Sequence, residues 1–254
     1  MRGRDRPGRT PLAPRLDSIW RRYSQESRRP LYCLLFLFPL VATYEFGSIL
    51  VRPTAWPERQ LVAHSLIQRL LSWFGASGFW LPAVALVLTL LLWHILGRHP
   101  WRVRGRLLPL MVVESLVLTV PLFVLGQVMM EAARGAAREF DLREQIVLAL
   151  GAGIYEELVF RLYLIVLLMR LFEGVLKLPD KFGGPLAIGV SALIFAACHF
   201  APIGREPLAW KHFLLLVLAG GYLGQVFVWR GLGIAAGCHV SFNLILLAWE
   251  AWGG

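Results

Sequence analysis

Charged residues are scarce in this chain. Only 17% of its 254 residues are Asp, Glu, Lys or Arg, whereas 57% are hydrophobic. Soluble domains carry about 25% charged and about 45–50% apolar residues, so this balance is that of a membrane protein. Because the apolar runs cover most of the chain, they leave no room for a separate soluble domain.

Cysteine and aspartate are also sparse. The three cysteines, Cys33, Cys198 and Cys238, all lie in apolar runs, which favours small core residues over a disulfide framework. The aspartates all fall outside the predicted spans, and they are Asp5, Asp17, Asp141 and Asp180. This placement argues against aspartyl chemistry within the membrane.

The basic residues account for a net charge of +10 and gather at two places. Nine arginines lie in the first thirty residues, and Arg98, Arg102, Arg104 and Arg106 fill a short loop between apolar runs. Basic clusters beside spans are the positive-inside signal, so we predict a cytoplasmic N-terminus and loop and no nucleic-acid partner. We expect residues 1–30 to form a disordered, Arg-rich cytoplasmic arm that can lie on anionic headgroups.

Apolar runs predict an all-α, polytopic transmembrane helix bundle of about seven spans, or eight. The runs are Leu31–Leu50, Phe79–Leu96, Leu107–Met130, Ile146–Leu171, Pro185–Phe200, His212–Trp229 and Leu232–Trp249. Each approaches the roughly 20 residues that cross a bilayer, and the first has no signal-peptidase site after it. Glu58–Phe74 has apolar residues at helical spacing, which indicates an interfacial amphipathic helix. Residues 31–254 therefore form one membrane domain, with its motif-bearing core at 146–250.

The topology follows from the same runs. Segment 131–144 lies outside, and seven spans place the C-terminus outside as well. An alternative remains: if "IVLALGAG" is a re-entrant piece broken at Gly151 and Gly153, the later spans reverse direction.

The stretch "YEELVFRLYL" places three charged residues inside an apolar run. Each charge at membrane depth costs about 2.5–3.5 kcal/mol on the insertion scale, so each needs a partner or a function. Glu157 and Arg161 are four residues apart and share a helical face, which predicts a structural ion pair. Glu156 lies about 100° around the helix and has no such local partner. Glu156 is therefore the carboxylate available for chemistry.

Two later runs each carry a deep histidine. Phe195 and His199 in "FAACH", and His239 and Asn243 in "HVSFN", are separated by four residues and share a face. Left apart in lipid these groups would be costly, whereas together with Glu156 they could satisfy one another in a polar pocket. Glu and His around a water form a general base, and His239 and Asn243 could donate to an oxyanion. This set predicts hydrolysis of an acyl compound, most naturally a peptide bond.

The same motifs resemble those of a known family. "EELVFR", "FAACH" and "HVSFN" are similar, in order, to the E-E-x-x-x-R, F-x-x-x-H and H-x-x-x-N motifs of the CPBP family, the CAAX-protease and bacteriocin-processing intramembrane endopeptidases. The resemblance implies that Glu156 and His199 activate water, that His239 and Asn243 stabilise the oxyanion, and that Glu157 and Arg161 hold the site together. It also implies a membrane-anchored or lipidated protein or peptide substrate and a bacterial cytoplasmic (inner) membrane location. Leu162, where many bacterial members have Gly, is a departure that removes no chemical group.

Other chemistries remain as alternatives. A zinc-dependent protease would use Glu156, His199 and His239 as ligands, although the chain has no H-E-x-x-H motif, and we favour a mechanism without a cofactor. A serine mechanism through Ser77 in "GASG" is disfavoured because that serine lies in a turn before a span. A Cys–His dyad is disfavoured because adjacent helical residues point apart. A membrane scaffold or proton-coupled transporter is the non-enzymatic alternative.

Overall fold

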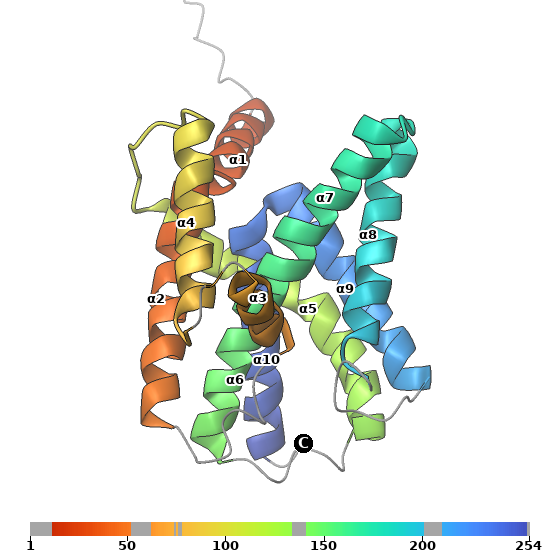
Figure 1. Cartoon of the computed structure of the whole chain (residues 1–254). Helices are drawn as coiled ribbons and strands as arrows, with labels where there is room; N and C mark the ends of the chain where they lie inside the picture. Colours follow the sequence, from red (N-terminus) through yellow and green to blue (C-terminus); the bar gives the residue numbers. More distant parts are fainter. Residues whose placement is uncertain are drawn as a thin grey trace, which may run out of the picture.

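A computed structural model describes residues 12–51, 62–73, 75, 78–133, 141–200 and 210–252, and this described part contains helices and no β-strand (Figure 1). In chain order the elements are α1 (Leu12–Ser27), α2 (Pro30–Leu50), α3 (Val62–Ser72), α4 (Leu81–Leu96), α5 (Leu107–Ala133), α6 (Leu142–Glu156), the π-helical η3 (Glu157–Ile165), α7 (Val166–Met169), the π-helical η4 (Arg170–Val175), α8 (Asp180–Ala197), α9 (Trp210–Arg230) and α10 (Leu232–Ala251). The predicted all-α class is confirmed. Each predicted apolar run overlaps a helix, and the fourth run extends over several consecutive helical elements.

Within the described residues, four helices are long and apolar enough to cross a membrane. They are Pro30–Leu50, Leu107–Gln127, Trp210–Arg230 and Leu232–Trp249. Two further apolar helices, Leu81–Leu96 and Lys181–Ala197, are shorter. The chain is therefore an integral membrane protein, as its composition predicts.

The fourth predicted run forms one long helical element. Helix α6 continues into η3, α7 and η4 without an intervening loop, so the alternative break at Gly151 and Gly153 is not found. Gly153 serves helix packing instead: a Cβ there would lie 2.5 Å from Val240 Cγ2 and 2.7 Å from Val240 N. Only glycine allows α6 to approach α10 this closely, and small residues have this role in many membrane helix interfaces.

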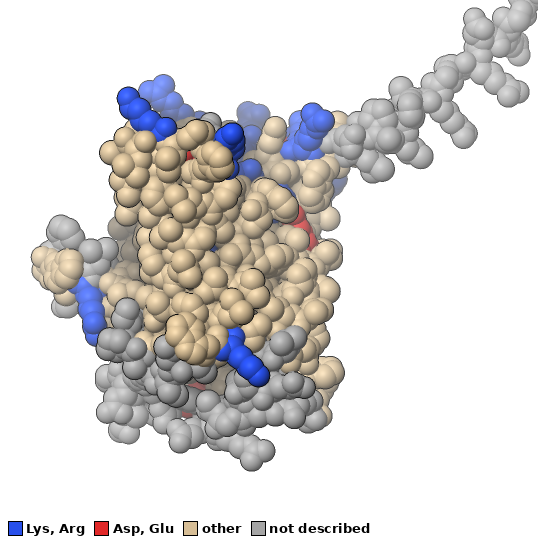
Figure 2. All heavy atoms as spheres, turned by 90° about the vertical axis from the view of Figure 1, so that its right-hand side faces the viewer, with Lys and Arg blue, Asp and Glu red and all other residues tan. Residues whose placement is uncertain are grey.

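The described arginines of the two basic clusters lie at one end of the bundle. The main-chain N–H of Arg104 donates to Tyr32 Oη at 2.8 Å, and Arg104 Nη1 lies 3.3 Å from Glu26 Oε1. The loop before α5 therefore contacts the start of α2, and Lys and Arg side chains gather at this end of the surface (Figure 2). Helix α10 (Leu232–Ala251) ends at the opposite end of the bundle (Figure 1). Both observations agree with the predicted distribution of arginines on one side.

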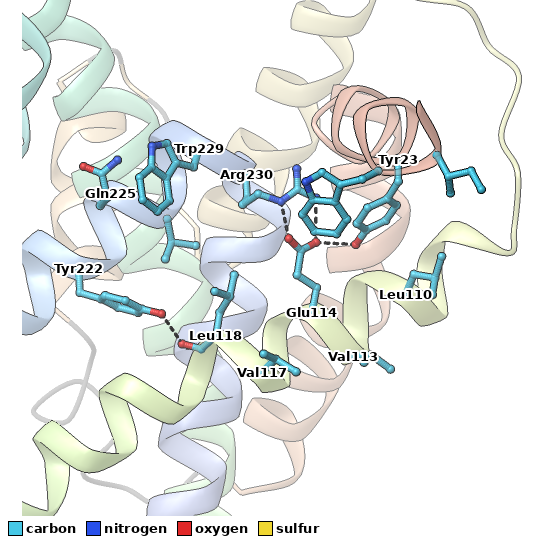
Figure 3. Close-up of a pocket in the computed structure, with 13 residues that line it drawn as sticks. Tyr23, Leu110, Val113, Glu114, Val117, Leu118, Tyr222, Gln225, Trp229 and Arg230 are labelled. Carbon is cyan, nitrogen blue, oxygen red and sulfur yellow. Dashed lines mark hydrogen bonds and ion pairs between the residues drawn. The ribbon is translucent and has the colours of Figure 1, made fainter. Parts of the chain in front are cut away.

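The predicted disordered arm is wrong over Leu12–Ser27, which forms α1. Its polar composition suggested disorder, yet Trp20 and Tyr23 lie on a face that packs on the bundle. Tyr23 is buried, and its hydroxyl donates to Glu114 Oε2 of α5 at 2.6 Å (Figure 3). This tertiary contact explains why composition alone misjudged the segment. Residues 1–11 lie outside the described part.

The predicted amphipathic helix is present as α3, over Val62–Ser72. Ala63 and Ile67 are buried, and Arg69 is exposed, as the apolar spacing predicts. The helix packs against α4 and α6. Residues 58–61 and 74 of the predicted helix lie outside the described part.

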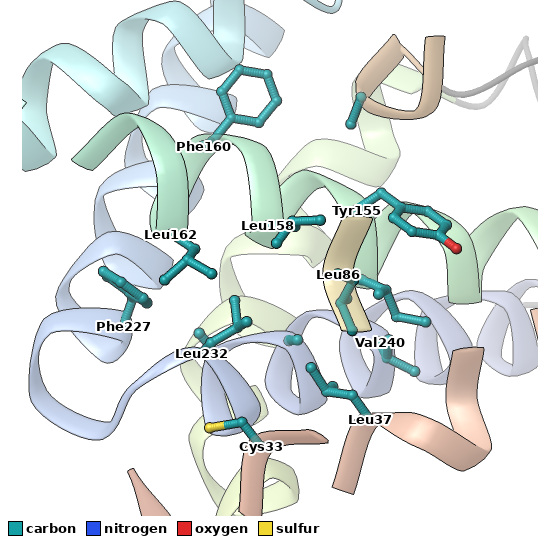
Figure 4. Close-up of a cluster of buried hydrophobic side chains, with 14 of the residues drawn as sticks. Cys33, Leu37, Leu86, Tyr155, Leu158, Phe160, Leu162, Phe227, Leu232 and Val240 are labelled. Carbon is teal, nitrogen blue, oxygen red and sulfur yellow. The ribbon is translucent and has the colours of Figure 1, made fainter. Parts of the chain in front are cut away.

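Helix α10 occupies the centre of the core. It packs against α5, α6, α2 and α9, and its first half has small buried residues that permit this close packing: Ala235, Ala236 and Cys238 are each 0% exposed. Leu232 and Val240 of the same helix lie among side chains from α2 and η3 (Figure 4). The three cysteines are free and buried, which confirms that they are core residues. The central position of α10 brings "HVSFN" to the middle of the bundle.

Candidate active site

The two adjacent glutamates lie where the long helix changes from α to π winding. Helix α6 ends at Glu156 and η3 begins at Glu157. π-helical segments are rare and are often found at functional sites. Glu157 and Arg161 are 0% and 1% exposed, and Arg161 Nη1 lies 3.2 Å from Glu157 Oε1. The predicted ion pair is therefore present, and it is fully buried.

Glu157 has a second partner that the sequence did not reveal. His239 Nδ1 lies 2.8 Å from Glu157 Oε1, within hydrogen-bonding distance. A carboxylate accepts, so Nδ1 carries the proton, and the other ring nitrogen is turned toward Glu156, with His239 Nε2 3.9 Å from Glu156 Oε2. Glu157 thus fixes the orientation of the His239 ring.

His199 is oriented by its own helix. Its Nδ1 lies 2.9 Å from the main-chain oxygen of Phe195. A carbonyl only accepts, so Nδ1 carries the proton, and in the neutral ring Nε2 is left as the acceptor. His199 is therefore set to accept a proton or a hydrogen bond through Nε2.

Phe195 connects the ion pair to the histidines. The Arg161 guanidinium carbon lies 4.5 Å from the centroid of the Phe195 ring, a cation–π contact. The same ring lies 4.7 Å from the ring of His199 and 6.5 Å from that of His239. Phe195 thus packs the two imidazoles against the buried charges.

A hydrogen bond to the main chain of α6 orients the Asn243 side chain. Its Nδ2 donates to the main-chain oxygen of Ala149 at 3.1 Å. This bond uses one of the two amide hydrogens, so the second can serve another acceptor.

The predicted residues meet at one cavity of about 170 Å³. Its polar lining comes from Glu156 at the end of α6, His199 in the turn after α8, and His239 and Asn243 in the middle of α10. The apolar lining consists of Leu122, Ala152, Phe195, Leu216, Ala219, Leu223 and Phe242. A water occupies about 30 Å³ in the liquid, so the cavity has room for several. Glu157 and Arg161 lie behind this lining.

The zinc alternative was compared with the same geometry. Among the described residues, no three His, Cys, Asp or Glu side chains are arranged so that they could hold a metal ion. His239 Nδ1 is bonded to Glu157, which leaves Nε2 as the nitrogen that could be a ligand. The zinc alternative stays a prediction, and no step below is routed through a metal. Ser77, the serine alternative, lies outside the described part.

One buried acid near the site was missed. Glu45 of α2 is 4% exposed, and its Oε1 accepts a 2.5 Å hydrogen bond from the hydroxyl of Tyr155, the residue before Glu156. Its Oε2 has no hydrogen-bond partner in the part of the chain that the structure describes. The sequence signal for Glu45 was an acidic residue within the first apolar run. Its hydrogen bond to Tyr155 shows that α2 helps to hold the end of α6.

Comparison with protein families found a match over part of the chain. The family described as type II CAAX prenyl endopeptidase Rce1-like matches residues 140–245, less than half of the chain. This segment is similar to that family. The match confirms the resemblance to the CAAX-protease family, and the Rce1-like segment contains Glu156, His199, His239 and Asn243 together with Glu157 and Arg161. Two further comparisons found no significant match, to a curated protein or to a solved structure.

Proposed function

We propose that the chain is an intramembrane endopeptidase that hydrolyses a peptide bond in a membrane-anchored or lipidated protein or peptide. The observation that supports it most is the convergence of Glu156, His199, His239 and Asn243 on one cavity. The apolar helices and the Rce1-like segment agree with it. By the positive-inside rule, α1 and the loop before α5 face the cytoplasm, in a bacterial cytoplasmic membrane.

In this mechanism a water lies between Glu156 and His199. Its oxygen attacks the carbonyl carbon of the scissile bond while one proton passes to the Glu156 carboxylate. His199 Nε2 accepts a hydrogen bond from the remaining hydrogen and orients the water. Positioned general bases contribute about 10²–10⁴-fold to such reactions.

The negative charge then develops on the former carbonyl oxygen. An imidazolium at His239 has Nδ1–H directed to Glu157, and its Nε2–H can donate to this oxyanion. The second amide hydrogen of Asn243 is the other donor. When the C–N bond breaks, the proton held by Glu156 passes to the leaving nitrogen, which gives a new carboxyl group and a new amine. Glu157 acts through His239, as a positioning residue.

The test compares wild-type and Glu156→Gln cells by mass spectrometry of membrane-protein termini and released peptides. We expect a set of termini that depends on Glu156, and a peptide spanning one of them should be cleaved by the purified protein in liposomes. Activity that survives a strong chelator supports the mechanism without a metal, whereas loss restored by zinc supports the zinc alternative. Full function of Glu156→Gln, or proton or solute flux with no peptide product, would contradict the protease proposal.

A further inference from the structure

Glu45 is a buried acid in the first membrane-spanning helix, and the proposed mechanism does not use it. The residue lies on α2 and is 4% exposed. It lies outside residues 140–245, so the family match assigns it no role. An ionisable residue at membrane depth costs free energy unless it is paired or has a function. Glu45 therefore needs an explanation beyond packing.

Glu45 makes a short hydrogen bond to α6. Its Oε1 accepts from the Tyr155 hydroxyl at 2.5 Å, and its Oε2 has no hydrogen-bond partner among the described residues. A carboxyl group has an oxygen that can accept this bond in either protonation state. Tyr155 is 0% exposed and lies in the hydrophobic core (Figure 4). Because both groups are buried, bulk water does not compete for the bond.

Tyr155 is the residue directly before Glu156. Successive side chains on a helix point about 100° apart, so a helix whose Tyr155 is held against α2 directs Glu156 to another side. Glu156 lines the catalytic cavity, and Glu157 Oε1 lies 2.8 Å from His239 Nδ1. Three successive residues thus have three separate partners, which are α2, the cavity and α10.

The rotation of α6 decides where the Glu156 carboxylate lies. A helix with its side chains has a radius of about 5–6 Å, so a rotation of about 10° moves this carboxylate by about 1 Å. A misplacement of that size can lower a rate about 10²-fold. The bond from Tyr155 to Glu45 opposes this rotation at the residue before Glu156.

Aromatic packing holds the Tyr155 ring independently of its hydroxyl. The Tyr44 ring meets the Tyr155 ring edge-on with the centroids 5.3 Å apart, and it stacks on the Phe79 ring at 6.5 Å. A Cβ at Gly47 of α2 would lie 2.7 Å from Val147 Cγ2 of α6, so the two helices also pack closely there. The interface between α2 and α6 therefore has other contacts, and loss of the hydroxyl bond can be tested in a folded protein.

We propose that Glu45 is a positioning residue for Glu156 and acts through the Tyr155 hydroxyl. This inference rests on the proposed protease function and extends its site to α2, outside the Rce1-like segment. Glu45 does not line the cavity. It fixes the rotation of α6 and thereby the position of the base.

The test measures cleavage of the peptide identified by its Glu156-dependent terminus, with purified protein in liposomes. Glu45→Leu removes the acceptor and Tyr155→Phe removes the donor, and each should lower kcat about 10- to 100-fold. KM should stay within about twofold of wild type, because neither residue lines the cavity. The double variant should be no slower than the slower single variant, because both changes remove the same bond.

Glu45→Gln is the conservative variant, because it keeps an oxygen that can accept from Tyr155. It should recover most of the rate, to within about threefold of wild type. A Glu45→Gln protein as slow as Glu45→Leu, or additive losses in the double variant, would overturn the action through this bond.

A matched control is present on the same long helical element. The hydroxyls of Tyr163 and Thr89 lie 2.7 Å apart and join η3 to α4, and neither residue lines the cavity. Tyr163→Phe removes the same kind of bond at another place, and its kcat should stay within about twofold of wild type. Equal losses of kcat in Tyr163→Phe and Tyr155→Phe would show a general loosening of the bundle and contradict a positioning role.

A second readout does not depend on turnover. In the Glu156→Gln protein, Glu45→Leu should leave the affinity for the same peptide unchanged, because the lining of the cavity is intact. A loss of affinity of about tenfold or more would show that the cavity has collapsed and would overturn the proposal. Wild-type kcat in the Glu45 and Tyr155 variants would also overturn it and leave the protease proposal standing. If wild type cleaves no such peptide, the protease proposal fails, and this inference fails with it.

Discussion

Among the described residues, two Glu–Arg clusters can be compared, and they differ in how many of their polar atoms have a hydrogen-bond partner. In the first cluster, which joins α1, α5 and α9 and is called the Glu114 cluster here, Arg230 binds Glu114 through Nε and Nη2. Arg230 also donates to Ser24 and Ser27. At the candidate site, Arg161 meets Glu157 through one contact of 3.2 Å. There, Glu157 Oε2 and Arg161 Nε have no hydrogen-bond partner among the described residues.

The difference separates a structural cluster from a chemical one. Buried polar groups are normally paired, so unsatisfied atoms in a buried cluster call for an explanation in function. In the candidate site, Glu157 orients His239 and makes one contact with Arg161, so the hydrogen-bonding capacity of Arg161 is not filled. Glu114 and Arg230, by contrast, fasten α1 and α9 to α5. The same pair of residue types, Glu and Arg, therefore has a structural role in one cluster and a positioning role in the other.

The largest expected effect comes from breaking the pair in the site. Arg161→Ala leaves Glu157 as an uncompensated buried charge, and loss of one partner of such a pair costs about 3–5 kcal/mol. The free energy of unfolding in detergent should fall by that amount, and peptide cleavage should be lost. A variant as stable as wild type would show that Glu157 does not depend on Arg161.

Glu157→Gln tests the positioning role within the same pair. The amide oxygen can still accept from His239 Nδ1, but it supplies no negative charge for an imidazolium. By analogy with the Asp-to-Asn change in catalytic triads, kcat should fall about 10²–10⁴-fold. The pH dependence of kcat should also change, and a purely structural role would leave it unmoved. Glu157→Asp keeps the charge and should restore part of the rate.

Glu114→Gln weakens the Glu114 cluster. It removes the charge from the hydrogen bonds to Arg230, and hydrogen bonds to charged groups are worth about 1.5–3 kcal/mol. Thermal unfolding should reveal a loss of this order. A loss as large as that of Arg161→Ala would contradict the proposed contrast between the clusters.

Ser24→Ala should have the smallest effect. It removes one of several partners of Arg230, so we expect a loss of about 1–2 kcal/mol in stability. Because Ser24 does not line the cavity, peptide cleavage should be unchanged. A change in kcat would show that the Glu114 cluster and the candidate site are coupled.

Periodicity and membrane energetics were sufficient to predict the apolar helices, the Glu157–Arg161 pair and the polar residues that line the cavity. The pair is local, four residues apart on one helix, and the motif residues are costly unless they meet. The bond from Glu157 to His239 joins helices that are 82 residues apart, and spacing cannot specify it. Helix α1 was missed because its stability depends on Tyr23 meeting Glu114, and Glu45 was missed because its partner, Tyr155, comes from another helix.

The central claim is that Glu156 is the base and Glu157 its structural neighbour. The most direct measurement is hydrolysis of one identified peptide by purified wild type, Glu156→Gln and Glu157→Gln in liposomes, with unfolding followed in parallel. The account predicts that Glu156→Gln unfolds like wild type and has no detectable turnover, while Glu157→Gln retains a residual rate. Turnover by Glu156→Gln near the wild-type rate would contradict it.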